Sequence, residues 1–225
     1  MSTGIVTGAS RGLGLSLGRA LAQRGWRLVV DARDGGLLEA AWAVPANVVV
    51  VPGDVSDPDH RRALVDAAGG RIDLVVNNAS VLGPSPQPPL DAYPLDVLRR
   101  VYEVNVIAPL ALVQLALPSL AAAARVLNIT SDAAVEPYES WGGYGSSKAA
   151  LDQLSAILAA EHPELRVYAV DPGDMRTQLQ QEAFPGEDIS DRPPPEESIP
   201  GLLALIEGDL PSGRYVAREL AEVPA

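Results

Sequence analysis

The sequence predicts a single α/β domain, a doubly wound parallel sheet of about seven strands with helices on both faces. The first observation behind this prediction is that short β-prone runs alternate with helical patterns along the whole chain. The second is the run at residues 48–51, which is entirely valine with no polar alternation, as in a strand buried on both faces. The third is a composition of 225 residues with 47% hydrophobic content, enough for a large core. Residues 1–225 are therefore expected to form one domain.

The individual elements follow from local patterns. Runs rich in Val, Ile and Leu between turn residues predict strands, at 3–7, 26–32, 48–51, 72–76, 125–130, 165–170 and 214–217. Apolar residues at helical spacing predict helices, at 15–24, 35–43, 58–68, 95–123, 145–160 and 199–207. Pro45 is expected to stop the second helix, and Pro109 and Pro118 to bend the fourth.

Composition excludes several classes of function. The net charge of −12 argues against a nucleic-acid backbone or an anionic membrane surface as a partner. The absence of Cys excludes disulfides, thiolate metal sites and cysteine nucleophiles. Only His60 and His162 are present, so no metal site is expected, and both are interpreted as ordinary helix-surface residues. No basic leader with an apolar run is found and no apolar stretch is expected to reach the length of a membrane span, which favours a cytoplasmic location.

A glycine-rich turn joins the first strand to the first helix. Gly8 permits a tight turn, Gly12 lets the backbone approach a pyrophosphate, and Gly14 allows close packing of helix on strand. The N-terminus of the following helix offers free N–H groups to a phosphate. This context predicts a dinucleotide site, although the spacing G-x-x-x-G-x-G is also compatible with a plain glycine-rich loop.

The end of the second predicted strand is where the adenosine ribose of a dinucleotide is recognised. An acid there suits a free 2′-hydroxyl and a basic residue suits a 2′-phosphate, and here Asp31 and Arg33 compete. Both can point to the same face, so position alone does not decide between them. Arg11 in the glycine turn is a second candidate for the phosphate, which favours NADP over NAD, unless Arg33 is only a solvated turn residue.

Residues 128–148 hold the candidate chemistry. Tyr144 and Lys148 are four apart, so a helix places the phenol and the amine on one face. A nearby ammonium favours the phenolate and is expected to lower the pKa of the phenol, making Tyr144 a general acid or base. Ser131 could hydrogen-bond the reacting oxygen. The alternative interpretation of the Tyr–Lys spacing is an exposed, solvated pair.

Other polar residues stand at strand ends or inside helices. Asp54 could accept from an adenine amino group or cap the helix that begins at residue 58. Residues 77–78, two asparagines, are either hydrogen-bonding hubs or ligand contacts, and Thr177 could bond a carboxamide. Asn105 lies within an apolar helix, where asparagine is either solvent-facing or placed for a polar role. The acidic, proline-rich segment 178–198 is expected to be a mobile substrate lid rather than a folded unit.

Taken together, these residues resemble the short-chain dehydrogenase/reductase family over nearly the whole chain. The matching motifs, in the family's order and spacing, are TGASRGLG at 7–14, Asp54-Val55, NNAS at 77–80, Asn105, Ser131, YGSSK at 144–148 and PGDMRT at 172–177. The resemblance implies a Rossmann-type fold with a catalytic tetrad of Asn105, Ser131, Tyr144 and Lys148. It also implies cofactor contacts from Tyr144, Lys148, Gly8, Ser10, Arg11, Gly12, Leu13, Gly14, Arg33, Asp54, Val55, Asn77, Ala79, Pro172, Gly173, Met175 and Thr177.

By this resemblance, Tyr144 would transfer the proton and Ser131 would bind the carbonyl or hydroxyl oxygen. Lys148 would hold the nicotinamide ribose and depress the pKa of Tyr144, and Asn105 would support a water-linked proton path. Arg11 and Arg33, with Ala32 where NAD-preferring relatives tend to carry an acid, resemble the NADP subgroup. Ser80 in NNAS and Asp174 after the Pro-Gly turn depart from the family's commoner pattern.

The sequence thus predicts an NADP(H)-dependent oxidoreductase that interconverts a carbonyl and a secondary alcohol on a small molecule, with NAD(H) as the alternative cofactor. The rivals are an NADP(H)-binding sensor or scaffold without turnover, and a nucleotide-sugar epimerase or dehydratase. The segment after Pro172 leaves little room for the domain that the second rival needs. The helices at 95–123 and 145–160 resemble the family's dimer faces, so a homodimer or homotetramer is expected.

Overall fold

The computed structural model describes residues 1–43 and 46–221. Its centre is a seven-stranded sheet in the order β3-β2-β1-β4-β5-β6-β7, parallel throughout. The strands are β1 Thr3–Val6, β2 Arg27–Ala32, β3 Val48–Pro52, β4 Ile72–Asn77, β5 Leu120–Ile129, β6 Arg166–Asp171 and β7 Gly213–Val216. The predicted single-domain parallel sheet of Rossmann type is confirmed.

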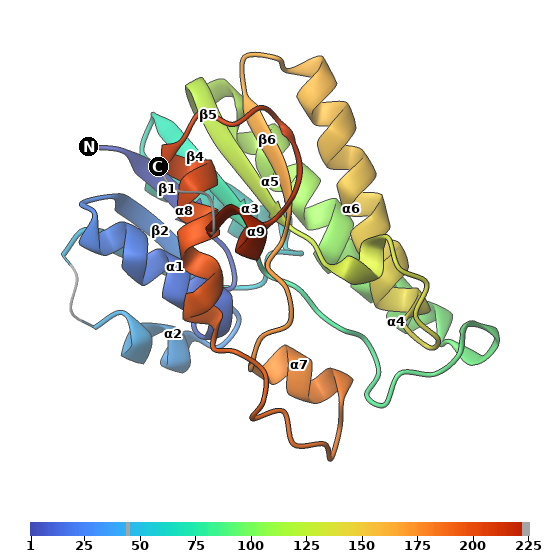
Figure 1. Ribbon diagram of the computed structural model, residues 1–225. Coiled ribbons are helices and arrows are strands. Elements are labelled where there is room, and N and C mark those ends of the chain that lie inside the picture. The colour runs from blue at the N-terminus through green and yellow to red at the C-terminus, as the bar shows by residue number, and fades with distance from the viewer. Residues whose placement is uncertain (44–45, 222–225) are drawn as a thin grey trace.

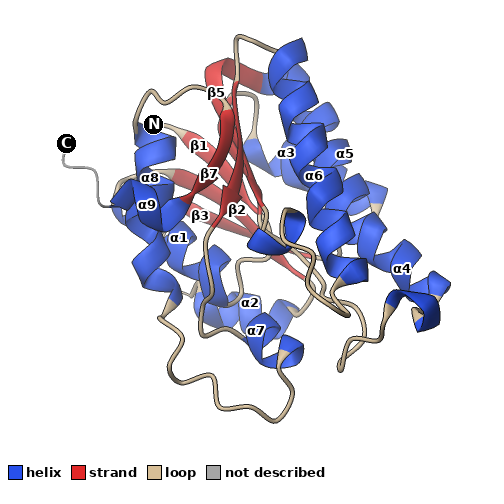
Figure 2. Ribbon diagram, turned by 45° about the vertical axis from the view of Figure 1, so that its right-hand side comes forward, coloured by secondary structure: helices blue, strands red, loops and turns tan. Residues whose placement is uncertain are grey.

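Helices cover both faces of the sheet (Figures 1 and 2). They are α1 Gly12–Gln23, α2 Gly35–Ala41, α3 Pro58–Ala68, α4 Leu95–Tyr102, α5 Ala108–Ala116, α6 Gly142–Glu161, α7 Gln178–Ala183, α8 Ile199–Glu207 and α9 Ala217–Ala221. Leu17 of α1 and Leu202 of α8 are fully buried on one face. Leu64 of α3, Leu112 of α5 and Leu158 of α6 belong to the core of the other face.

The strand order places a crevice at the carboxyl ends of the strands. The chain runs outward from β1 to β2 and β3, then returns to the other side of β1 to build β4 and the strands beyond it. The loops that follow β1 and β4 therefore leave the sheet in opposite directions, and ligands of doubly wound sheets bind between them. The predicted glycine turn follows β1, so the topology sets it at this crevice.

The predicted helix 95–123 is confirmed as a helical run to residue 119 and is wrong at residues 120–123. The chain forms α4, a π-helical turn at Glu103–Ile107, α5 and a 3₁₀ turn at Leu117–Ser119, and then enters β5 at Leu120. Pro109 has no amide hydrogen to donate to the carbonyl of Asn105, so a regular helix cannot continue there. Leu120 instead pairs with Ile72 of β4, which takes residues 120–123 into the sheet.

The helical run 95–119 is, by length and composition alone, apolar enough to cross a membrane, contrary to the expectation that no stretch reaches this length. Half of its most apolar window is buried inside the protein. Leu112 and Val113 of α5 lie in the core between the helices and the sheet. Burial in the core thus accounts for the apolar composition of α5.

Two further segments differ from expectation. Helix α2 ends at Ala41, while Pro45, the residue predicted to stop it, lies outside the described residues. The segment 178–198 is not structureless, because it contains α7 and a 3₁₀ turn at Pro195–Ser198. Thr177 caps α7 by accepting a hydrogen bond from the Gln180 amide at 3.3 Å, and Ile189 is 6% exposed. The predicted mobility of this segment stays a prediction.

Candidate active site

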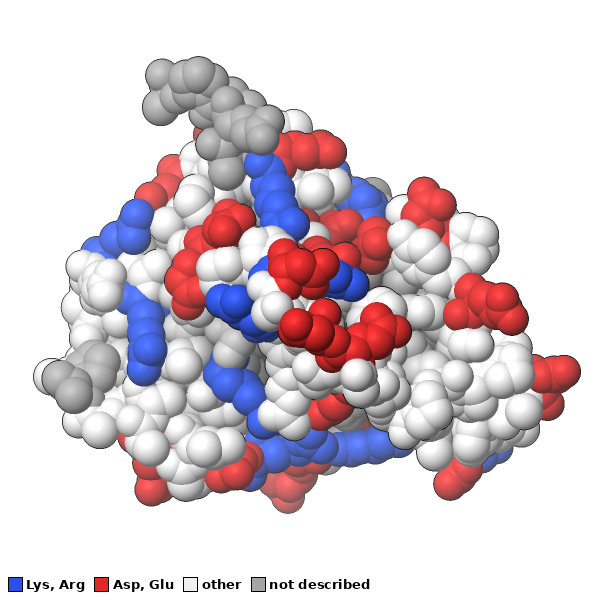
Figure 3. Space-filling model, turned by 60° about the horizontal axis from the view of Figure 1, so that its bottom comes forward, with Lys and Arg blue, Asp and Glu red and all other residues white. Residues whose placement is uncertain are grey.

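A cavity of about 1570 Å³ opens at the carboxyl ends of the strands. Basic and acidic side chains both surround the hollow on this face (Figure 3). The cavity is lined by the glycine turn, by residues that follow β2 to β6, and by α6 and α7. Every predicted catalytic or cofactor residue lines it except Gly14, Asn77 and Asn105.

The glycine turn presents the open end of α1 to the cavity. Gly8 and Gly12 have φ of 67° and 56°, which favours glycine at both positions. No side chain caps the N-terminus of α1, so its first N–H groups are free to bind an anion. A Cβ on Gly14 would lie 2.5 Å from the Gly8 carbonyl oxygen. Gly14 therefore serves the close packing of α1 and not the lining of the cavity.

Asp31 is not available to read a ribose. It is 1% exposed, its Oδ1 accepts from the Gly8 amide at 2.7 Å and its Oδ2 lies 3.0 Å from His60 Nε2. Burial raises the pKa of Asp31, although the hydrogen bonds from His60 and Gly8 oppose the rise. His60 is only 8% exposed, so its interpretation as a helix-surface residue is wrong. A buried carboxylate beside a glycine amide requires such a partner, which the sequence pattern did not reveal.

Arg33 is placed differently from Asp31. It is exposed, lines the cavity, and forms no hydrogen bond or ion pair with any residue that the structure describes. Arg11 also lines the cavity and donates to the side chain of Gln178. Two arginines thus face the cavity close to the glycine turn, while the neighbouring acid is occupied by protein groups.

The carboxylate of Asp54 is held at the edge of the cavity. Its Oδ1 accepts from the amide and the hydroxyl of Ser56 at 2.9 and 2.8 Å, and its Oδ2 accepts from Arg100. Burial acts to raise the pKa of Asp54, but the bonds from Ser56 and the charge of Arg100 outweigh it and lower the pKa. The residue that caps α3 is Asp57, so the alternative role of Asp54 as a helix cap is wrong.

The asparagines divide into structural residues and a cavity residue. Asn77 donates to Asn128 Oδ1 at 2.7 Å within the sheet. Asn105, 1% exposed, accepts from the Val81 amide at 2.9 Å and donates to the Val81 carbonyl at 2.9 Å, so its side chain is fixed away from the cavity. Asn78, which belongs to the NNAS motif but is not among the implied cofactor contacts, lines the cavity and donates to the Thr7 carbonyl at 2.8 Å.

Ser131, Tyr144 and Lys148 meet at one end of the cavity. Helix α6 begins at Gly142, earlier than predicted, so Tyr144 lies in its first turn and Lys148 one turn later. Both are buried, at 6% and 2% exposure, which rules out an exposed, solvated pair. The Lys148 amine lies 5.4 Å from the centroid of the Tyr144 ring and donates to the Ile129 carbonyl at 2.8 Å.

A glycine allows this convergence. A Cβ on Gly145 would lie 2.6 Å from the carbonyl oxygen of Ala133, because the first turn of α6 lies directly against the turn that follows β5. That turn is a 3₁₀ helix at Asp132–Ala134, capped by Ser131. Close contact between backbones thus sets Ser131 beside the phenol of Tyr144.

The expected fall in the pKa of Tyr144 is contradicted. Burial raises its pKa, and the charges of Asp171 and Asp132 raise it further. The hydroxyls of Ser131 and Ser80 oppose the rise where they donate to the phenolate. Burial also lowers the pKa of Lys148 to about 8, against the opposing charge of Asp152. Desolvation penalises both charged forms, so it outweighs the attraction on which the expectation rested.

Arg214 of β7 was missed by sequence reasoning. It donates to the Ser131 carbonyl at 3.1 Å and to Asp152 at 3.0 Å, and lies 3.6 Å from Asp171. It therefore ties the end of β5 to two carboxylates that act on the pKa values of Tyr144 and Lys148. Its distance along the chain from every motif explains why no pattern indicated it.

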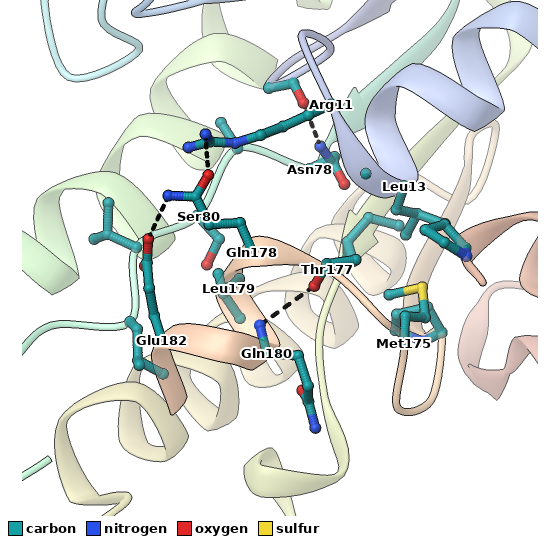
Figure 4. Close-up of a pocket in the computed structure, with 18 of the residues that line it drawn as sticks. Arg11, Leu13, Asn78, Ser80, Met175, Thr177, Gln178, Leu179, Gln180 and Glu182 are labelled. Atoms are coloured by element: carbon teal, nitrogen blue, oxygen red, sulfur yellow. Dashed lines mark hydrogen bonds between the residues drawn. The ribbon is translucent and has the colours of Figure 1, made fainter. Parts of the chain in front are cut away.

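Helix α7 forms another wall of the cavity (Figure 4). Gln178 accepts from Arg11 and donates to Glu182 at 2.9 Å, and Ser85 donates to the Glu182 carbonyl at 2.7 Å. Leu179 packs with Leu82 and Tyr144, which makes this part of the lining apolar. Of the two departures noted in the sequence, Ser80 donates to Asn105 and Asp174 accepts from Gln180, both at 3.1 Å.

Comparisons with known proteins agree with this geometry. The family model for short chain dehydrogenases matches residues 3–188. An uncharacterized oxidoreductase of Saccharomyces cerevisiae is 29% identical, over 98% of this chain and 90% of its own. A benzil reductase of the same yeast is 32% identical, over 79% of this chain and 73% of its own. A short chain dehydrogenase of Escherichia coli CFT073 solved with NADPH superposes with a TM-score of 0.88 at 27% identity, covering 96% of each chain.

Proposed function

The chain belongs to the short-chain dehydrogenase/reductase family of NAD(P)-binding oxidoreductases, and we propose that it is an NADP(H)-dependent enzyme that interconverts a carbonyl and a secondary alcohol. One observation carries this proposal. Buried Tyr144 and Lys148 meet Ser131 in the same cavity into which the uncapped end of α1 opens. The candidate proton donor and the anion-binding end of α1 can therefore act on a substrate and a cofactor that bind side by side in this cavity.

The lining fits a dinucleotide. The free N–H groups of α1 suit its diphosphate, and Arg33, unengaged among the described residues, suits a 2′-phosphate together with Arg11. Asp31, whose oxygens are occupied by Gly8 and His60, does not compete, which favours NADP over NAD. The carboxylate of Asp54 is held in place by Ser56 and Arg100, and it is the candidate to contact the adenine.

Other residues are the candidates to contact the nicotinamide end of the cofactor. When bound, the cofactor supplies the hydride. Lys148 is the candidate to hold its ribose, and the turn at 172–177 is the candidate to hold its carboxamide side. Asn105 fixes the turn at Val81 through its side chain, and we propose that it also supports a water-linked proton path.

Tyr144 is the proposed proton donor in the reducing direction. Its raised pKa keeps the phenol protonated at neutral pH, which suits a general acid for a carbonyl oxygen. Ser131 holds the same oxygen or the phenol itself. The charges of Asp171 and Asp132 also favour the protonated phenol.

The proposed substrate is a small apolar carbonyl compound. The wall beside Tyr144 is made by Leu82 and Leu179, and segment 178–198 is proposed as the lid that carries it. The relative named a benzil reductase places benzil, an apolar diketone, in the test panel. Ile107 and Ile157, exposed at 46% and 43% on neighbouring helical segments, support a homo-oligomer. A cytoplasmic location stays a prediction.

The test has two steps. Binding of NADPH and NADH is measured by fluorescence titration, followed by NADPH consumption with a panel of apolar ketones and diketones that includes benzil. We expect tighter binding of NADPH and turnover of at least one diketone. Tyr144→Phe should lose nearly all turnover, about a hundredfold or more, with cofactor affinity unchanged. Binding of NADPH without consumption across the panel would favour the sensor or scaffold instead, and full activity of Tyr144→Phe would refute the proton role.

A further inference from the structure

Asp31 and His60 form a buried pair between the end of β2 and the first turn of α3. His60 Nε2 lies 3.0 Å from Asp31 Oδ2, and the two side chains are 7% and 1% exposed. The other carboxylate oxygen, Oδ1, accepts from the Gly8 amide at 2.7 Å. Protein groups thus hold both oxygens of Asp31, which fixes this acid at the point where it lines the cavity.

Gly53 makes room for the imidazole of His60. A Cβ on Gly53 would collide with the His60 ring, so a larger residue there would displace it. The Gly53 amide donates to the Ala32 carbonyl at 3.0 Å, and Gly53 directly precedes Asp54, the candidate to contact the adenine. The His60 ring therefore packs behind the residues proposed to hold the adenosine half of the cofactor, although His60 itself does not line the cavity.

The protonation of this pair sets the charge beside the candidate 2′-phosphate site. Asp31 and Arg33 both line the cavity, so a charge on Asp31 acts on an anion that Arg33 binds. Burial raises the pKa of Asp31 against the hydrogen bonds from His60 and Gly8, because a buried carboxylate is costly without a counter-ion. A proton held between Asp31 Oδ2 and His60 Nε2 removes that cost. The pair is then neutral, whichever of the two atoms carries the proton.

Burial gives the charge of Asp31 more weight than the charges of neighbouring acids. Asp54 also lines the cavity, but it is paired with Arg100. Asp34 is exposed, so water and salt screen its charge. A charge on Asp31 would be surrounded by protein and screened much less. Its neutralisation therefore matters most for the binding of a second anion at this end of the cavity.

We propose that His60 is a specificity-determining residue of the cofactor site, which shares a proton with Asp31 and so allows a 2′-phosphate to bind beside a buried acid. The inference rests on the proposed function, because it concerns the preference for NADP. A neutral pair does not repel the phosphate. An ionised Asp31 beside a neutral imidazole would oppose the phosphate, and would act much less on a ribose with a free 2′-hydroxyl.

His60→Gln tests the inference, because glutamine keeps an N–H donor for Asp31 but cannot take up the shared proton. Asp31 is then left ionised beside the phosphate site. Near neutral pH we expect NADPH to bind about tenfold more weakly, and NADH to keep its affinity to within about twofold. Fluorescence titration with each cofactor, in the absence of a carbonyl substrate, measures both affinities.

His60→Gln combined with Asp31→Asn is the rescue variant. It removes the uncompensated charge, and the new side-chain amide still offers an oxygen to the Gly8 amide. We expect this double variant to regain most of the lost NADPH affinity, which a merely structural role of His60 would not allow. Asp31→Asn alone should bind NADPH no more tightly than the wild type, because the wild-type pair already carries no net charge.

His162→Gln is the matched control. His162 also pairs with an acid, Glu164, at 3.0 Å, but it is more exposed, follows the end of α6 and does not line the cavity. Its affinities for both cofactors should equal those of the wild type. The inference would be overturned by unchanged NADPH binding in His60→Gln, by equal losses for NADPH and NADH, or by a double variant as weak as His60→Gln. A selective gain of NADPH affinity in Asp31→Asn would overturn it too.

The binding measurements separate this inference from the proposed function. A selective loss of NADPH affinity in His60→Gln, in a protein that turns over no carbonyl, supports the role of His60 and contradicts the proposed function. Turnover by the wild type, with the preference between NADPH and NADH unaltered in His60→Gln, contradicts the role of His60 alone.

Discussion

The difference between Asp31 and Arg33 is decided by what each side chain already contacts. The sequence presents an acid and a base at the end of one strand, and alternation cannot choose between them. The structure buries Asp31 between a glycine amide and His60 and leaves Arg33 exposed at the cavity. Predicting this would have required knowing that His60, from a distant helix, reaches the strand.

At this scale, Arg33→Ala should weaken NADPH binding while leaving NADH binding unchanged. Arg33 has no competing partner among the described residues, so its contact with a 2′-phosphate is lost in full. A charge-assisted bond at a partly exposed site corresponds to about tenfold in Kd. Fluorescence titration of both cofactors measures the effect. Arg24→Ala, which removes an exposed arginine paired with Glu207, is the control. Equal losses for NADH and NADPH would argue against a phosphate contact.

At the scale of elements, the strand–turn–helix units at β1–α1 and β5–α6 were predictable because motif and periodicity coincide in each. The boundary near residue 120 was not. An alanine run follows Leu120, and alanine is compatible with a helix by propensity and with a strand by pairing. The register with β4 decided for the strand. Helix α9 was missed because it is short. The π-helical turn lies where a bend at Pro109 was expected, although the sequence did not indicate its form.

The close contact of α6 with the turn after β5 can be tested by substituting the glycine that allows it. Gly145→Ala places a Cβ against the Ala133 carbonyl, so the helix must move away from Ser131. We expect turnover to fall about tenfold or more and stability by about 1–3 kcal/mol. Gly142→Ala in the same helix meets only the exposed side chain of Leu90, which can move aside. Comparable losses in the two variants would point to a general effect on the helix instead.

Across the whole molecule, the single sheet and its crevice followed from alternation of elements, while the electrostatics of the site did not. Burial of Lys148 lowers its pKa from 10.5 to about 8, so between these values the unfolded chain binds more protons than the folded protein. Stability from this group therefore rises with pH through that window. The raised pKa of Tyr144 gives the opposite trend only above its ordinary value near 10.

Urea unfolding of wild type and Lys148→Met measures this effect. The difference in unfolding free energy should change in favour of the wild type by about 2 kcal/mol between about pH 8 and pH 10. The methionine variant is the reference because it fills similar space without a titrating group. A difference that stays constant with pH would show that the amine is solvated in the folded protein.

Arg214 supplies a positive charge to the catalytic centre from β7, the last strand that the structure describes. Every recognisable motif has been synthesised once residue 177 is made, yet the guanidinium that meets Asp152, Asp171 and the Ser131 carbonyl belongs to the strand at the sheet's outer edge. A nascent chain arrested before β7 would hold all its signature residues around two carboxylates lacking their counter-ion. The charge balance around the centre therefore depends on an edge strand that carries none of the signature residues.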